Sequence, residues 1–166
     1  MKVLIPARAG SKRIPNKNIV DLNGSPLISY AIATSLDAVD EVYVSTDSLE
    51  IENIAKECGA NVIKRPPEIS GDFSSTNLVI EHFLNTVDDV DYFACVQPTS
   101  PLLSTVYLKK GLNRIVTEDY NSIISVTRGT HFFWNCNHEP INFDREKRSR
   151  TQDMEPWYAE NGAFYI

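Results

Sequence analysis

The chain has 166 residues, 42% of them hydrophobic and 23% charged, with a formal net charge of −6. This size and composition are typical of one domain with a buried core, and no apolar run approaches the length needed to cross a bilayer. The acidic balance argues against general affinity for nucleic acid or membranes, so we expect a cytoplasmic protein with neither partner. Three widely separated cysteines predict neither a disulfide nor a zinc site.

Short apolar runs alternate with amphipathic stretches through the first 126 residues. The strands are predicted at Lys2–Ile5, Glu41–Ser45, Asn61–Lys64, Asp91–Gln97 and Asn121–Val126. The helices are predicted to begin at Ser25-Pro26, with Ser25 as the N-cap, then after Asp47 or Ser48, at Thr76 and at Ser104 or Thr105. We expect the helix from Thr76 to Val87 to carry an apolar stripe of Leu78, Ile80, Phe83, Leu84 and Val87.

This alternation of strand and helix predicts an α/β fold. Right-handed crossovers give a Rossmann-like, mostly parallel sheet with helices on both faces. Ligands of such sheets bind at the carboxyl ends of the strands. The polar segments that follow three predicted strands are therefore expected to meet there, and they are Arg8–Asn18, Ser45–Asp47 and Gln97–Ser100.

The segment after the first predicted strand is strongly cationic. It carries Arg8, Lys12, Arg13 and Lys17, while Gly10 and Ser11 allow backbone N–H groups to approach an anion. It is neither a Walker loop nor a G-x-G-x-x-G dinucleotide loop. The pattern favours a polyphosphate site modestly over a solvated basic turn.

The pattern changes after about Arg128. Residues 130–157 hold an aromatic cluster at Phe132–Trp134 and a basic run at Arg145–Arg150, without helical periodicity. We interpret 130–157 as a β and loop excursion, an arm or dimerisation element, within a single domain of residues 1–166. Gly162–Ile166 is predicted to be a final strand.

Five segments in order resemble the CMP-sialic acid synthetases, the acylneuraminate cytidylyltransferases. They are Pro6–Asn18 (PARAGSKRIPNKN), Val44–Asp47 (VSTD), Gln97–Pro101 (QPTSP), Lys147–Asp153 (KRSRTQD) and Glu160–Tyr165 (ENGAFY). The resemblance implies a fold of the nucleotide-diphospho-sugar transferase type. It also implies transfer of CMP from CTP to the anomeric hydroxyl of a nine-carbon keto sugar acid, with release of pyrophosphate and help from Mg²⁺.

The resemblance also assigns roles to residues. Arg8, Lys12 and Lys17 are the catalytic candidates, because fixed cations stabilise charge on the departing pyrophosphate. The nucleotide-binding candidates are Ala7, Arg8, Gly10, Ser11, Asn18, Asp72, Ser74 and Ser75. Asn18 is equally interpretable as a turn cap, Ser74 and Ser75 as helix caps, and Asp72 as an ordinary loop acid.

The sugar acid is expected to meet Gln97, Ser100, Arg148, Arg150, Gln152 and Asn161. Arg148 and Arg150 suit a carboxylate, because a guanidinium binds it with two parallel hydrogen bonds. By family analogy the arm crosses to the partner of a homodimer, so these arginines are expected to act in trans. A solvated basic arm is the alternative.

The metal ligands are unassigned. The family pattern continues with an aspartate-rich segment resembling a metal-ligand motif, which these 166 residues do not contain. We expect either a piece of a longer protein or a different metal arrangement. Two other functions stay open: a related sugar nucleotidyltransferase acting on Kdo or using another nucleotide, and a nucleotide-binding fragment that is catalytically incomplete.

Overall fold

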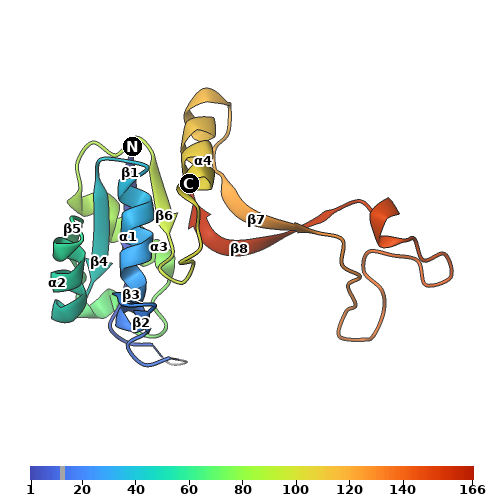
Figure 1. Cartoon of the computed structure of the whole chain (residues 1–166), viewed down its shortest axis with the longest axis horizontal. Coiled ribbons are helices and arrows are strands. Elements are labelled where there is room, and N and C mark those ends of the chain that lie inside the picture. Colours follow the sequence, from blue (N-terminus) through green and yellow to red (C-terminus); the bar gives the residue numbers. More distant parts are fainter. Residues whose placement is uncertain (12–13) are drawn as a thin grey trace. The chain divides into compact units, whose positions relative to one another are not determined.

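The computed structural model describes residues 1–11 and 14–166 (Figure 1). Its strands are β1 (Lys2–Pro6), β2 (Asp21–Leu22), β3 (Ser25–Pro26), β4 (Val42–Thr46), β5 (Asn61–Lys64), β6 (Phe93–Val96), β7 (Ile124–Gly129) and β8 (Trp157–Tyr165). Its α-helices are α1 (Leu27–Leu36), α2 (Leu49–Glu57), α3 (Thr76–Thr86) and α4 (Thr105–Thr117). Three short 3-10 helices are η1 (Lys17–Ile19), η2 (Pro67–Ile69) and η3 (Thr151–Asp153).

Six strands form the main sheet in the order β5-β4-β1-β6-β8-β7. Strand β1 lies between β4 and β6 and is parallel to both, and β4 is also parallel to β5. Strand β8 runs antiparallel to β6, with Cys95 opposite Tyr165. Beside it, Ile123 and Ile166 exchange two backbone hydrogen bonds, of 2.9 and 2.8 Å. The predicted mostly parallel Rossmann-like sheet is confirmed.

The central strand β1 is buried on both faces because helices cover both. Val3 and Ile5 pack into one apolar cluster with residues of α1, α2 and α4. Leu4, between them in sequence, points to the opposite face and packs with Phe83 and Val87. This alternation follows from the two-residue period of a strand. The sheet therefore keeps the carboxyl end of β1 fixed between two packed layers.

The antiparallel hairpin of β2 and β3 was not predicted. Its turn is Asn23-Gly24, and both residues have positive φ, which is the preferred sequence of a tight two-residue hairpin turn. Since Pro26 pairs with Asp21 in this hairpin, α1 begins at Leu27 and Pro26 is its N-cap. The prediction that Ser25 caps the helix is therefore wrong.

Two further details differ from prediction, namely the buried face of α3 and the start of β7. In α3 the buried residues are Val79 and Phe83, whereas Leu78 and Leu84 are 42% and 44% exposed. The predicted stripe is therefore confirmed only in part: Phe83 and Val87 are buried and Ile80 packs beside them. The buried Val79 was not predicted. Strand β7 begins at Ile124, three residues beyond its predicted start at Asn121.

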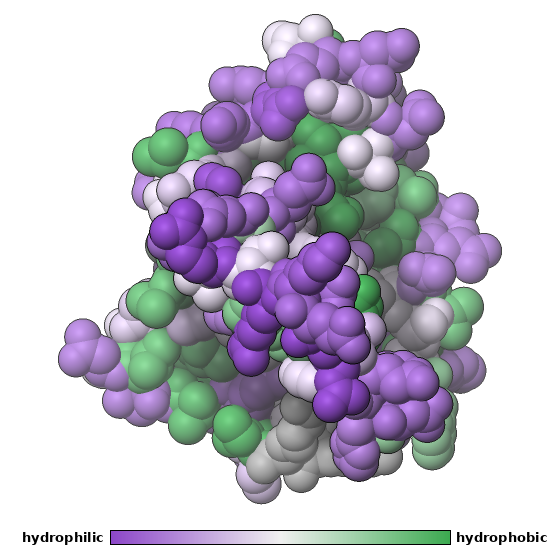
Figure 2. Space-filling model, turned by 90° about the vertical axis from the view of Figure 1, so that its right-hand side faces the viewer, coloured by the Kyte–Doolittle hydropathy of each residue, from purple (hydrophilic) through white to green (hydrophobic). Residues whose placement is uncertain are grey.

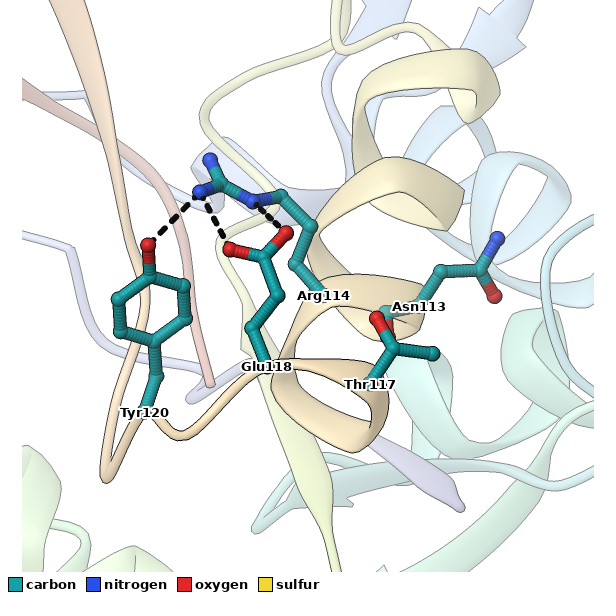
Figure 3. Close-up of polar contacts among 5 residues, drawn as sticks. All are labelled: Asn113, Arg114, Thr117, Glu118 and Tyr120. Carbon is teal, nitrogen blue, oxygen red and sulfur yellow. Dashed lines mark hydrogen bonds and ion pairs between the residues drawn. The ribbon is translucent and has the colours of Figure 1, made fainter.

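The end of α4 is tied to the segment that follows it (Figure 3). Arg114 donates from Nε and Nη2 to the two carboxylate oxygens of Glu118, both at 2.8 Å, and from Nη2 to the hydroxyl of Tyr120 at 2.9 Å. This fork lowers the pKa of the Glu118 carboxyl below its ordinary value of 4.5. All three side chains are solvent-exposed, so the contacts direct the chain from α4 toward β7 without forming part of the core.

Contacts divide the chain into two compact units. Unit 1 comprises Met1–Ile124 and Gly162–Ile166, and unit 2 comprises Ser125–Asn161. The description of 1–166 as a single nucleotidyltransferase domain with an arm at 130–157 stays a prediction.

Figure 2 shows a face on which hydrophilic residues are interspersed with separate hydrophobic areas. Of the helices in the described residues, none is long and apolar enough to span a membrane.

Candidate functional site

A cavity of about 190 Å³ lies in unit 1 beside the carboxyl ends of β1 and β6. Its lining combines three cationic side chains with hydroxyl, amide and backbone groups. The described residues that line it are Pro6, Arg8, Gly10, Ser11, Lys17, Asn18, Arg65, Ser74, Thr76, Val79, Gln97, Pro98 and Thr99. No carboxylate is among these lining residues, so the cavity is suited to an anionic ligand.

The loop after β1 is held in place by the neighbouring strand β4. The Ala7 N–H donates to the Ser45 carbonyl at 2.9 Å, and the Ala9 N–H donates to Asp47 Oδ1 at 2.8 Å. Asn18, only 8% exposed, donates from Nδ2 to the Arg8 carbonyl at 3.0 Å. These three bonds fix the backbone on either side of Arg8. Asp47 therefore positions the loop, while Ser48 caps α2 by accepting from the Ile51 N–H.

Arg65, which follows β5, is a buried cation of the cavity wall. Its side chain donates from Nε to Ser45 Oγ at 3.1 Å and from Nη2 to the Ser45 carbonyl at 2.8 Å. Burial lowers its pKa, and Asp47 partly opposes this effect. Arginine nevertheless keeps its charge at any physiological pH. Ser45 thus fixes the orientation of a charged planar group at the cavity.

Arg8 is paired with a carboxylate from another loop. Its Nη1 donates to Asp72 Oδ1 at 2.7 Å, although 64 residues separate the two in sequence. The two side chains are 30% and 39% exposed, so this pair lies at the solvent-accessible edge of unit 1. Arg8, a lining residue of the cavity, therefore already has an internal counter-ion.

Gln97 lies in the cavity wall just after β6. Its backbone N–H donates to the Ala163 carbonyl at 3.0 Å, and its side-chain Nε2 lies 3.8 Å from Cys95 Sγ. Burial raises the pKa of the Cys95 thiol to about 12, so it stays protonated and is no nucleophile at neutral pH. Of Cys95 and Gln97, it is the side-chain amide of Gln97 that lines the cavity.

The cavity brings together seven of the predicted site residues: Arg8, Gly10, Ser11, Lys17, Asn18, Ser74 and Gln97. Four others of unit 1, Ala7, Asp72, Ser75 and Ser100, are not part of its described lining. Ala7 is fully buried, and Ser75 precedes α3 without a side-chain capping bond. Ser100 forms a backbone turn with Gln97 and Leu103. The prediction for Lys12 lies outside the described residues.

The remaining four predicted substrate residues belong to unit 2. Arg148 stacks on Phe132, with its guanidinium carbon 3.9 Å from the ring centroid, and Arg150 pairs with Asp153 at 2.7 Å. Gln152 lies in η3, and Asn161 donates to Thr127 Oγ1 at 3.3 Å. Within unit 2 these arginines have intramolecular partners, and their role toward a substrate stays a prediction.

Three polar lining residues were not predicted as site residues: Arg65, Thr76 and Thr99. Arg65 could have been predicted from the sequence, because it directly follows the predicted strand Asn61–Lys64 and so lies at the same edge of the sheet as Arg8. Thr99 lies within the QPTSP segment whose Gln97 and Ser100 were named.

The described residues offer little to a divalent metal ion. Among residues 1–11 and 14–166, no group of three or more His, Cys, Asp or Glu side chains is placed to hold an ion. Magnesium takes oxygen ligands, commonly one or two carboxylates with substrate phosphates, and the described cavity lining offers no carboxylate. The described residues therefore do not fit a metal centre by themselves, although they fit phosphate.

The α/β fold of this chain is shared with solved structures. The chain superposes on CMP:2-keto-3-deoxy-manno-octonic acid synthetase complexed with CTP, with a TM-score of 0.74. The two are 19% identical, over 99% of this chain and 72% of the other. A 4-diphosphocytidyl-2C-methyl-D-erythritol synthase from Anaerococcus prevotii gives a TM-score of 0.64 at 14% identity, over 99% and 69% of the two chains.

Residues 2–164 match the cytidylyltransferase family, and the chain belongs to it. It is 41% identical to an N-acylneuraminate cytidylyltransferase of Oncorhynchus mykiss, over 98% of this chain and 40% of the relative. It is 34% identical to a pseudaminic acid cytidylyltransferase of Campylobacter jejuni, over 98% of this chain and 76% of the relative. The resemblance inferred from the five motifs is confirmed. The chain spans about two-fifths of the length of the N-acylneuraminate relatives.

Proposed function

We propose that this protein transfers CMP from CTP to the anomeric hydroxyl of a nonulosonic acid and releases pyrophosphate. The observation that carries the proposal is the cavity beside β1 and β6, whose described lining includes Arg8, Lys17 and Arg65 and no carboxylate. Arg8 and Lys17 suit the triphosphate of CTP, because cationic side chains bind phosphate oxygens through charge-assisted hydrogen bonds. The relatives named above act on N-acylneuraminate and pseudaminic acid, so a nine-carbon keto acid is the proposed acceptor.

The proposed reaction is a single displacement at the α-phosphorus. The oxygen of the sugar hydroxyl forms the new bond, the bond to the β-phosphate oxygen breaks, and the hydroxyl proton is lost to solvent or to a basic group. Negative charge grows on the departing pyrophosphate. Arg8 and Lys17, together with Lys12 from the sequence, are proposed to stabilise that charge, because cations fixed beforehand need no reorganisation.

Arg65 and Ser74 are proposed to face the cytosine base. Cytosine presents a carbonyl oxygen and a ring nitrogen as acceptors, and a guanidinium offers five N–H donors in one plane. The two hydrogen bonds from Arg65 to Ser45 use only some of these N–H donors, and they fix the orientation of the guanidinium plane. The Ser74 hydroxyl, which both donates and accepts, lies in the same cavity wall.

The acceptor acid is proposed to meet Gln97 and Ser100 in unit 1 and Arg148, Arg150, Gln152 and Asn161 in unit 2. Two arginines suit the carboxylate of the acid. We further propose a homodimer in which the arginines of one subunit serve the site of the other. The aromatic cluster of unit 2, in which Phe132 and Trp134 both lie against Phe143, supports an interface role.

Magnesium and a cytoplasmic location complete the proposal. The metal would supply charge neutralisation on the phosphates. Its requirement is checked by comparing pyrophosphate release in the presence of MgCl₂ with release after chelation by EDTA. Fractionation of the source cells tests the location.

The deciding experiment measures pyrophosphate release from CTP and MgCl₂ with each of N-acetylneuraminic, pseudaminic, legionaminic and Kdo acids. Release that depends on one nine-carbon acid supports the proposal and identifies the substrate. Release with Kdo alone, or with UTP or ATP in place of CTP, indicates a related sugar nucleotidyltransferase. CTP binding without release for any acid indicates a nucleotide-binding chain that lacks catalysis on its own. The control measures pyrophosphate release from CTP and MgCl₂ without any sugar acid.

A further inference from the structure

The contact between Arg8 and Asp72 places a carboxylate on a cation that the phosphate site needs. Arg8 lines the cavity, and its Nη1 donates to Asp72 Oδ1 at 2.7 Å. A guanidinium binds carboxylate and phosphate oxygens with the same donors and similar geometry. Asp72 therefore occupies a donor that an incoming phosphate would use.

The segment around Asp72 is anchored on both sides. Before it, the Ser70 N–H donates to the Pro67 carbonyl at 3.1 Å and Ser70 Oγ donates to the Pro66 carbonyl at 2.8 Å. After it, the Ser74 N–H donates to the Gly71 carbonyl at 3.2 Å, which closes a turn containing Asp72. The carboxylate is thus presented to Arg8 by a structured turn, and Ser74 of the same turn lines the cavity.

We propose that Asp72 is a built-in competitor of the polyphosphate and sets its affinity. Arg8 exchanges the carboxylate for a phosphate oxygen when the ligand enters, and it returns to Asp72 when pyrophosphate leaves. This inference rests on the proposed function, because it takes the cavity as the phosphate site. Asp72 lowers affinity in two ways: its pair with Arg8 must break, and its charge repels the anion.

The effect of Asp72 on affinity is modest because the pair is partly exposed. Ion pairs of this exposure contribute little to stability. We therefore expect its removal to tighten pyrophosphate binding by about two- to fivefold. The same change slows pyrophosphate dissociation, since mutations within one site act mainly through the dissociation rate.

The test is calorimetric titration of inorganic pyrophosphate into the full chain at low ionic strength. Asp72→Asn, which keeps the shape and removes the charge, is expected to bind two- to fivefold more tightly than the wild type. Glu68→Gln is the matched control, because it removes one exposed carboxylate from η2 of the same segment. In an Arg8→Ala background, the gain from Asp72→Asn is expected to shrink, because only the charge repulsion between Asp72 and the anion remains to be removed. Asp72→Ser repeats the test with a smaller side chain.

Three results would overturn the inference. The first is equal or weaker binding by both Asp72 variants, the second is an equal gain in Glu68→Gln, and the third is an undiminished gain without Arg8. A wild type that binds neither pyrophosphate nor CTP refutes the phosphate cavity itself, and with it both proposals. Wild-type binding without a gain in the variants refutes the role of Asp72 alone.

Discussion

Arg65 is buried and donates two hydrogen bonds to Ser45, so its guanidinium is held in a defined orientation. We predict that Arg65→Lys weakens CTP binding by about tenfold, since lysine lacks the planar set of donors. Pyrophosphate binding is expected to stay within about twofold, because the proposed contact is to the base. Equal losses for both ligands would instead assign Arg65 to the phosphates. Lys64→Met, next to it and exposed, is the control.

Asp47 acts on the same site through the backbone. Its Oδ1 accepts the Ala9 N–H of the cationic loop, so Asp47→Ala removes one anchor of that loop. We predict that pyrophosphate binding weakens by up to about tenfold, the scale of one hydrogen bond. Asp47→Asn keeps an acceptor oxygen at the same place and is expected to bind like the wild type. A loss of equal size in both variants would show that the charge of Asp47 matters, and would argue against the positioning role.

At the scale of elements, α3 is held against the sheet by one aromatic side chain. Phe83 is fully buried and lies 5.7 and 5.5 Å from the ring centroids of Tyr43 and Phe93. We predict that Phe83→Ala lowers the free energy of unfolding by about 3–5 kcal/mol, as expected for a large cavity. Leu84→Ala, one residue on and 44% exposed, is expected to stay within about 0.5 kcal/mol. Urea unfolding of both variants measures the difference.

The end of α4 gives a prediction for pH. Because the Arg114 guanidinium holds the pKa of Glu118 below 4.5, the pair stabilises the folded chain above that pH. The contribution is lost as the pH falls through the lowered pKa of the folded state. Melting temperatures measured across the acid range should therefore depend less on pH in Glu118→Gln than in the wild type. High salt should reduce the difference, since the pair is exposed. Identical pH profiles at low salt would contradict the prediction.

For the whole molecule, the sheet was predictable because local patterns encode it. Strands β1 and β6 contain the apolar runs Val3–Ile5 and Phe93–Val96, and Arg8 and Gln97 come soon after them. The contacts that define the site are not local. The pairing of Arg8 with Asp72 spans 64 residues, and the burial of Arg65 depends on the packing of β5 beside β4. The hairpin at Asn23-Gly24 was not predicted, although its turn sequence is a local signal for a two-residue hairpin.

The route of the chain through β7 and β8 has a consequence for engineering. Unit 1 is built from two stretches of sequence, Met1–Ile124 and Gly162–Ile166, and unit 2 is an insertion between them. Its two ends leave from neighbouring strands, where Ile123 and Ile166 are hydrogen-bonded to each other. Adjacent strands lie roughly 5 Å apart, a gap that a tight turn closes. A two-residue turn joining the shortened strands would therefore give a shorter chain that keeps the residues lining the phosphate cavity. Pyrophosphate titration of that shorter chain would measure the phosphate cavity without any contribution from the arm.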